Sequence, residues 1–189
     1  MGNKRSFDVY YLLVSEGTSE YRLFGYLTTR KFRELFSKSD IKFSDKVELV
    51  EIGVSQGRLG GVGNIDDFKS KYALIREKYK GQKRFFVLDK DIDDSIIIGR
   101  IIIENGDIVQ FLEYNSEHLI LRLSRKSPKG PSDFKNLGEF RDYCKSEFQR
   151  IFGKKVSDFK DSDFDTVFDS ASDDEIQKNF IELFDTLDN

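Results

Sequence analysis

The stretch Arg84-Phe85-Phe86-Val87-Leu88-Asp89-Lys90-Asp91, residues 84–91, decides the fold. Four apolar residues stand in a row at its centre, without the alternation of polar and apolar side chains that marks a strand with one wet face. An uninterrupted apolar strand is typical of a parallel sheet with helices on both faces. Residues 84–88 therefore predict a buried strand of an α/β domain, and the acidic residues that follow mark its end.

The segments before this strand alternate between strand-like and helix-like patterns. Residues 7–14 form an apolar run that predicts a first strand, which a helix follows as far as about residue 37, and residues 47–52 predict a second strand. Asn64 then precedes apolar residues spaced three and four apart between residues 65 and 79, the pattern of an amphipathic helix behind its N-cap. The order strand, helix, strand, helix, strand predicts right-handed crossovers and a parallel sheet flanked by helices.

Two further apolar runs, residues 96–103 and 108–112, flank the turn signal Glu104-Asn105-Gly106-Asp107. A turn of this composition between two apolar runs predicts a β-hairpin insertion after the third strand. Residues 117–123 fit either a helix or a short strand.

The C-terminal part is expected to be helical. Both prolines lie in residues 127–132, which predict a loop, and helices are expected over about 133–152 and 173–187. The sequence thus predicts an α/β domain at residues 1–126 and a helical, acidic C-terminal extension at residues 127–189.

The net charge of −3 is unevenly distributed. From Ser157 to the C-terminus there are eleven acidic and two basic residues, a local charge of −9, which leaves +6 for residues 1–156. A basic body with an acidic tail is compatible with a nucleic-acid partner, and such a tail is equally typical of an ordinary solvated C-terminus.

Targeting and redox features are few. No signal peptide is expected, because the N-terminus has no apolar segment followed by a small-residue cleavage site. The longest apolar stretch, residues 96–103, is too short to span a bilayer, so no membrane contact is expected. The single cysteine, Cys144, excludes an internal disulfide and a thiolate zinc cluster and is expected as a half-buried helix residue. These features predict a cytoplasmic protein.

Acidic residues directly follow two strands of the predicted sheet. Glu16 comes after the first strand and Asp89 after the third, and Asp91 lies two residues farther on. Because ligands bind beyond the carboxyl ends of parallel strands, these carboxylates are expected at one edge of the sheet. Such a cluster repels itself unless a cation neutralises it, and oxygen ligands without His or Cys suit Mg²⁺ or Mn²⁺ rather than zinc.

Other polar residues near this edge allow a structural interpretation as well as a functional one. Glu20 is either a further metal ligand or an acidic residue that caps its helix. Asp93 and Asp94 are interpreted as solvated turn residues, and the only histidine, His118, as a core-edge or surface residue.

The glycine-rich residues 57–63 also allow two interpretations. They are either a flexible turn or, together with Arg58 and the amides before Asn64, a phosphate site at a helix N-terminus. They have too few matching positions for the dinucleotide-binding fingerprint. They are not a P-loop either, because the P-loop lysine is missing.

Two of these segments resemble motifs of a known family. Residues 13–20, Leu-Val-Ser-Glu-Gly-Thr-Ser-Glu, resemble the Glu-Gly motif that opens the TOPRIM domain of topoisomerases, primases and related nucleases, and residues 88–91, Leu-Asp-Lys-Asp, resemble its Asp-x-Asp motif. The second glutamate of the first motif is similar to the form in the overcoming-lysogenization-defect nucleases and in small RloB-like proteins of restriction and phage-defence loci. Residues 60–65 are similar to the connector before the second helix in those nucleases, and residues 115–119 to a later acidic motif of the small proteins. The resemblance covers about residues 7–123.

The resemblance implies a TOPRIM-like, Rossmann-like fold and a metal-dependent nucleic-acid phosphodiesterase, an endonuclease with Mg²⁺ or Mn²⁺, in bacterial or phage defence. By this resemblance Glu16, Asp89 and Asp91 would be catalytic and would bind the metal, while Glu20 and Glu117 would support that ion or a second one. The residues expected to contact the backbone of DNA or RNA are Arg58, Lys90, Arg122, Arg125, Lys126 and Lys129.

Three other classes were weighed against this one. A haloacid-dehalogenase phosphohydrolase carries its Asp-x-Asp motif after the first strand with Thr or Val two positions beyond, whereas here the motif follows the third strand and position 93 is Asp. A receiver-like domain needs an acidic pair at the first strand, and Glu16 and Glu20 are split by a turn. A non-catalytic regulatory module stays open: it would keep the acidic site and bind nucleic acid, a protein partner or a second copy through the C-terminal helices.

Overall fold

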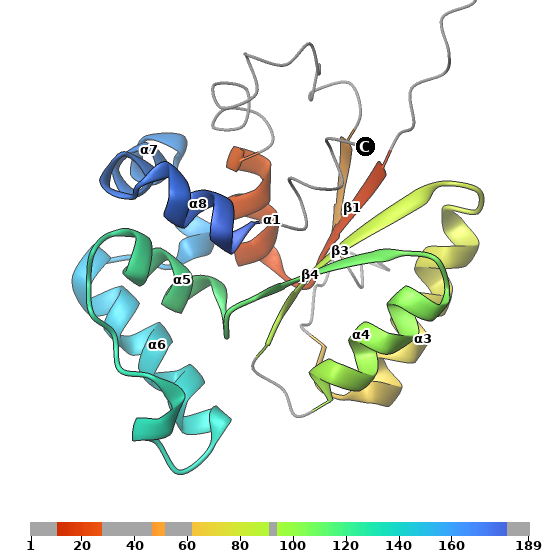
Figure 1. Cartoon of the computed structure of the whole chain (residues 1–189), viewed down its shortest axis with the longest axis horizontal. Coiled ribbons are helices and arrows are strands. Elements are labelled where there is room, and N and C mark those ends of the chain that lie inside the picture. The colour runs from red at the N-terminus through yellow and green to blue at the C-terminus, as the bar shows by residue number, and fades with distance from the viewer. Residues whose placement is uncertain (1–10, 28–46, 52–61, 91–93, 181–189) are drawn as a thin grey trace, which may run out of the picture.

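The fold is built on four parallel strands. The computed structural model describes residues 11–27, 47–51, 62–90 and 94–180. Within them the strands are β1 (Tyr11–Ser15), β2 (Val47–Glu51), β3 (Lys83–Asp89) and β4 (Ile108–Leu112). They form one sheet in the order β2-β1-β3-β4, with every neighbouring pair parallel (Figure 1). The predicted parallel α/β sheet is therefore confirmed.

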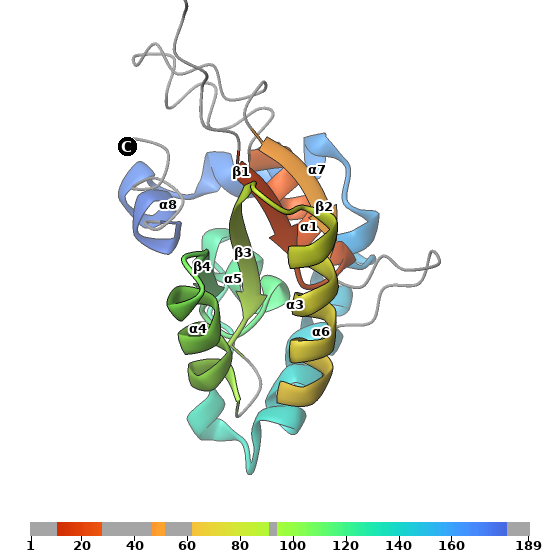
Figure 2. The same cartoon turned by 90° about the vertical axis from the view of Figure 1, so that its right-hand side faces the viewer.

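Helices cover both faces of this sheet. The α-helices of the described residues are α1 (Thr18–Tyr26), α3 (Ile65–Lys78), α4 (Ser95–Glu104), α5 (Ser116–Leu123), α6 (Leu137–Phe152), α7 (Asp161–Ser170) and α8 (Asp173–Asn179). Short 3-10 turns, η3 (Pro131–Asp133) and η4 (Val156–Asp158), precede α6 and α7. Figures 1 and 2 show α3 and α4 on one face and α1 with α5 to α8 on the other.

The apolar residues of the strands divide between two cores. Successive strand residues point to opposite faces, so Phe85 and Val87 pack with α1 and the C-terminal helices, whereas Phe86 and Leu88 pack with α3 and α4. All four side chains are buried. This two-sided burial explains why residues 85–88 lack a polar alternation.

The β-hairpin predicted over residues 96–112 is wrong. Ser95–Glu104 form α4, and Ile108–Leu112 run parallel to β3. The residues between them end the helix: Asn105 is its C-cap, and Gly106 has a φ of 76°, the left-handed conformation that glycine adopts readily. A hairpin turn and a helix end thus draw on the same residue types.

Packing explains why this segment is a helix. Ile98 and Ile102, one turn apart, are buried against the sheet, while Ile96 and Ile103 are 72% and 64% exposed. Gly99 faces Phe111 of β4, where an added Cβ would lie 2.8 Å from a ring carbon. The missing side chain lets α4 approach the sheet closely, and this tertiary contact outweighs the β propensity of isoleucine.

The remaining helices follow the sequence in part. α5 shows that residues 117–123 are helical, α6 begins at Leu137 instead of near residue 133, and α7 has no counterpart among the predicted helices. Cys144 lies in α6 as expected but is fully buried, at 0% exposed, rather than half-buried. The predicted start of the first strand at residue 7 and the extension of the first helix to about residue 37 lie outside the described residues.

The C-terminal helices pack directly on the sheet. Phe148 of α6 and Phe168 of α7 share one apolar core with Leu13 of β1 and Phe85 of β3. The division of the chain at residues 126 and 127 stays a prediction. In the part of the chain that the structure describes, no helix is both long and apolar enough to cross a membrane.

Candidate active site

The carboxyl edge of the sheet, where the parallel strands end, brings Glu16 and Asp89 together. Ser15 of β1 lies beside Val87 of β3, so the residue after β1 is level with the last residues of β3. The Glu16 amide donates to the Val87 carbonyl at 3.0 Å, and the Asp89 amide donates to Glu16 Oε2 at 3.0 Å. Two acidic residues 73 positions apart thus meet at one edge, as expected from the strand order.

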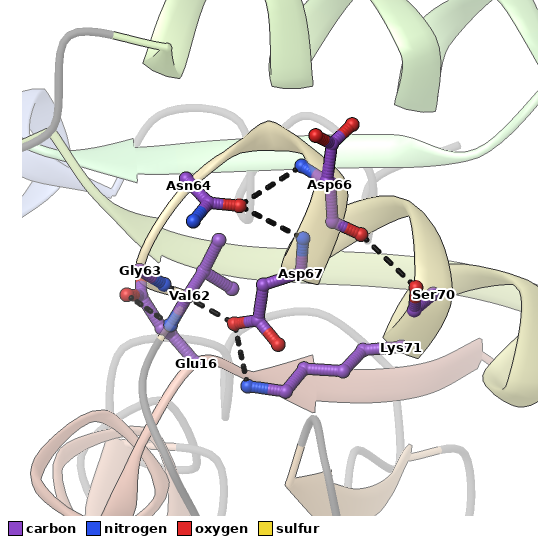
Figure 3. Close-up of polar contacts among 8 residues, drawn as sticks. All are labelled: Glu16, Val62, Gly63, Asn64, Asp66, Asp67, Ser70 and Lys71. Atoms are coloured by element: carbon purple, nitrogen blue, oxygen red, sulfur yellow. Dashed lines mark hydrogen bonds and ion pairs between the residues drawn. The ribbon is translucent and has the colours of Figure 1, made fainter.

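Glu16 also contacts the loop that precedes α3. Its second oxygen, Oε1, accepts a hydrogen bond of 3.0 Å from the Val62 amide, and the residue is 8% exposed (Figure 3). The carboxylate therefore links the ends of β1 and β3 to the loop before α3.

The N-terminus of α3 is capped by polar side chains of its own. Asn64 Oδ1 accepts from the amides of Asp66 and Asp67 at 3.1 and 3.0 Å, as expected of an N-cap (Figure 3). Asp67 Oδ2 accepts from the Gly63 amide at 3.2 Å and from Lys71 Nζ at 2.8 Å. Burial would raise the pKa of Asp67, but the hydrogen bonds from Lys71 and Gly63 outweigh it and lower that pKa.

The first backbone amide of α3 has its hydrogen-bond acceptor in Asp94, the N-cap residue of α4. Asp94 Oδ2 accepts from the Ile65 amide at 2.9 Å, so Asp94 is a half-buried bridge between helices rather than the solvated turn residue that was expected. The amides of Val62, Gly63 and Ile65 all donate to carboxylates, so these three are already occupied, and the two interpretations of residues 57–63 stay predictions. Arg58 and Asp93 lie outside the described residues.

Glu20 lies at the start of its own helix. The residue is 4% exposed, and a Cβ added to Gly17 would lie 2.9 Å from Glu20 Oε2. The carboxylate thus folds back over the first turn of α1, where the helix dipole favours a negative charge. Gly17 has a φ of −145°, which any residue adopts, so what the glycine provides here is space for the flexible Glu20 carboxylate. Both interpretations of Glu20, as a helix cap and as a metal ligand, stay predictions.

Glu117 starts α5 at the same edge of the sheet. The turn before it is tied to the end of β3, because the Lys90 amide donates to the Tyr114 carbonyl at 2.7 Å. Asn115 Oδ1 caps α5 by accepting from the His118 amide at 2.9 Å. Glu117 is 9% exposed, and its Oε2 lies 3.4 Å from Ser116 Oγ.

Three buried polar atoms near this edge have no hydrogen-bond partner among the described residues: Ser15 Oγ, Asn115 Nδ2 and His118 Nδ1. His118 is 4% exposed, so it is a core residue rather than a core-edge or surface one, and burial lowers its pKa. Buried polar atoms without partners are rare and call for a bound water, an ion or a ligand. Sequence reasoning missed Ser15 and Asn115, although both follow or end a strand at the predicted edge.

The described acidic residues alone do not complete a metal site. No group of three or more His, Cys, Asp or Glu side chains among them is placed to hold an ion, and Asp91 lies outside the described residues. Mg²⁺ commonly uses only one or two protein carboxylates and takes its other ligands from water and substrate phosphates. Glu16 and Asp89 offer carboxylate oxygens of the kind that Mg²⁺ and Mn²⁺ prefer, and a metal ion at this edge stays a prediction.

The basic residues expected to bind nucleic acid do not form one cluster among the described residues. Lys90 is exposed beside Asp89, at the edge. Arg122 pairs with Glu113, and Arg122 and Lys126 line a cleft of about 310 Å³ against α8. Glu113 directly follows β4, so this pair holds the Arg122 guanidinium near the end of that strand, whereas Lys126 lies beyond the end of α5. The other two predicted residues, Arg125 and Lys129, are exposed in the loop after α5.

Comparison with models of known protein families, with curated protein sequences and with solved structures found no match to this chain.

Proposed function

We propose that this chain is a metal-dependent nucleic-acid phosphodiesterase of the TOPRIM nuclease type, with its site at the carboxyl edge of the sheet. The observation that carries the proposal is the contact between Glu16 and Asp89, which follow or end the two central strands and meet through a 3.0 Å hydrogen bond. The same two residues belong to the two segments that resemble the Glu-Gly and Asp-x-Asp motifs.

In this proposal Glu16 and Asp89 would hold Mg²⁺ or Mn²⁺, and Asp91 would support that ion. When bound, such an ion polarises a phosphoryl oxygen and generates a nucleophilic hydroxide from its own water. Glu16 is held in position by the amides of Val62 and Asp89, which orient its carboxylate at the edge. Lys90, exposed next to the pair, would contact the phosphate backbone.

The resemblance to small RloB-like proteins supports a role in bacterial or phage defence. Glu117, buried at the start of α5 on the same edge, and Glu20, buried in the first turn of α1, are proposed as supporting residues for that ion or a second one.

The test is cleavage of end-labelled single-stranded DNA, duplex DNA and RNA with Mg²⁺ or Mn²⁺. Wild type is compared with Glu16→Gln, Asp89→Asn and a matched control, Asp169→Asn, which changes an exposed acidic residue of α7. Metal-dependent cleavage that is lost in both edge variants and kept in the control is the expected result. A folded, metal-binding wild type that cuts none of the substrates would instead favour the non-catalytic binding module.

A further inference from the structure

A row of aromatic rings leads away from the carboxyl edge, over α5 and α6. Tyr114, whose carbonyl accepts from the Lys90 amide, has its ring centroid 5.0 Å from that of Phe140. Phe140 is 5.6 Å from Phe134, and Phe134 is 4.9 Å from Tyr143. Figure 1 shows α6 beside α5, with the loop that joins them. The row thus connects the residue after Asp89 to the loop before α6.

Three of these four rings are only partly buried. Phe140 is fully buried, but Tyr114, Phe134 and Tyr143 are half-buried and keep part of their surface in solvent. Tyr114 is held at a φ of 75°, a conformation that aromatic residues rarely adopt. Backbone strain of this kind persists only where the surroundings impose it, and it is concentrated at functional sites.

The segment that carries Lys129, Phe134 and Tyr143 is basic in sequence. Residues 122–145 contain seven basic and three acidic residues, a net charge of +4. Lys129 belongs to the row itself, because its amide donates to the Tyr143 hydroxyl at 3.1 Å and its Nζ lies 6.0 Å from the centre of the Tyr143 ring. Half-exposed aromatic rings interleaved with cations are the features with which proteins bind unpaired bases and the phosphates between them.

The turn at the edge end of the row also carries unsatisfied polar atoms. Asn115 Nδ2 and His118 Nδ1, both buried, have no hydrogen-bond partner among the described residues. The His118 ring lies 5.1 Å from Tyr114 and 5.4 Å from Phe140, so it belongs to the same group of rings. Stacking surfaces and free hydrogen-bonding atoms therefore occur together where the row meets the acidic edge.

We propose that this aromatic row, defined as Tyr114, Phe134 and Tyr143 with Lys129, binds single-stranded nucleic acid and leads the strand to Glu16 and Asp89. Bases in a duplex are stacked on each other and present no face to a side chain, so a stacking surface selects unpaired bases. The inference rests on the proposed function for what happens at the edge, whereas binding by the row is independent of cleavage.

The experiment is fluorescence anisotropy with the full chain in EDTA, so that no strand is cut. The probes are fluorescein-labelled 15-nucleotide oligo-dT, oligo-U and a duplex of the same length. The variants are Phe134→Leu and Tyr143→Leu, which keep apolar bulk but remove the ring, with Phe152→Leu as the matched control, since Phe152 is a half-buried ring at the opposite end of α6. Circular dichroism checks that each variant is folded.

We expect both single strands to bind more tightly than the duplex, and each row variant to weaken that binding about tenfold, while the control does not. Lys129→Gln should reduce the slope of log affinity against log salt by about 0.7. Because Lys129 is exposed, this variant tests the row without a folding risk. A preference between oligo-dT and oligo-U would identify the natural strand, and equal binding would mean that stacking alone is read.

Duplex binding as tight as single-strand binding, or unchanged affinity in Phe134→Leu and Tyr143→Leu, would overturn the inference. If the row variants lose single-strand binding but the wild type shows no metal-dependent cleavage, the inference about the aromatic row is supported and the proposed function is refuted. Metal-dependent cleavage by the wild type, with unchanged single-strand affinity in the row variants, would support the proposed function and refute the role of the aromatic row.

Discussion

The two edges of the sheet hold buried acidic residues in opposite ways. At the amino edge, where β3 and β4 begin, Asp107 is 6% exposed and both its oxygens accept from Arg84 Nε, at 2.9 and 3.0 Å. Tyr72 of α3 donates a further hydrogen bond of 2.6 Å to the same carboxylate. At the carboxyl edge, Glu16 accepts from the backbone amides of Val62 and Asp89.

The two carboxylates differ in the donors that these contacts supply. At Asp107 a guanidinium offsets the negative charge, and the single Arg84 Nε–H is shared between both carboxylate oxygens. At Glu16 the donors of these two contacts are backbone amides, which orient the carboxylate and carry no net charge. Under the proposed function the amino edge serves stability and the carboxyl edge serves chemistry, and the following predictions test that division.

Breaking the amino-edge pair should have the largest effect. Asp107→Ala leaves the buried Arg84 charge without its partner, and we expect a loss of about 3–5 kcal/mol in the free energy of unfolding. Urea denaturation followed by circular dichroism measures this loss. Cleavage per folded molecule should stay at the wild-type level. A variant as stable as wild type would show that the pair contributes no stability to the fold.

Tyr72→Phe removes one hydrogen bond to the same carboxylate and should cost about 1.5–3 kcal/mol at neutral pH. Burial and then the hydrogen bond to Asp107 raise the pKa of Tyr72 above its ordinary value of 10.0. The unfolded chain loses this proton near pH 10 while the folded chain keeps it, so the stabilisation is present below that pH and is lost as the pH rises above it. Thermal unfolding between pH 8 and 11 should show a shallower alkaline decline in Tyr72→Phe than in wild type. An equal decline would place the titrating group elsewhere.

Two helix caps provide a matched pair. Asn64 caps α3 beside the Glu16 contact, and Ser172 caps α8 on the other face of the sheet. Asn64→Ala and Ser172→Ala should each cost about 1 kcal/mol of stability, because each frees a backbone amide that had a side-chain acceptor. Cleavage should fall only in Asn64→Ala, since that loop carries the Val62 amide to Glu16. Equal cleavage in both variants would show that the loop before α3 does not position Glu16.

The smallest effect is expected at Gly17. Gly17→Ala should push the flexible Glu20 carboxylate away from the first turn of α1 and cost about 0.5–1 kcal/mol. In a Glu20→Ala background the same change should be close to neutral, because the clashing group is gone. Additive losses in this double-mutant cycle would mean that the glycine is required for a reason other than space.

The elements that sequence reasoning found are those whose signals are local. Asn64 and the apolar spacing behind it predicted α3, because a cap and a 3.6-residue period are properties of one segment. The meeting of Glu16 with Asp89 also followed from sequence, since strand ends in a parallel sheet share an edge.

The elements that it missed depend on contacts between distant residues. Nothing in residues 96–103 shows that Gly99 packs on Phe111, so a run of β-branched residues was taken for a strand. α7 lies in an acidic stretch whose helical signal is limited to Phe164, Val167 and Phe168, which are spaced three and four residues apart. The amino-edge cluster joins Tyr72, Arg84 and Asp107 from three elements, and none of the three carries a local signal.

The central claim is that the carboxyl edge binds a divalent cation and the amino edge does not. The direct measurement is Mn²⁺ binding by electron paramagnetic resonance, with wild type, Asp89→Asn and Tyr72→Phe compared at equal concentrations of folded protein. We predict that wild type and Tyr72→Phe bind Mn²⁺ alike and that Asp89→Asn binds it far more weakly. Undiminished Mn²⁺ binding by Asp89→Asn would contradict the account.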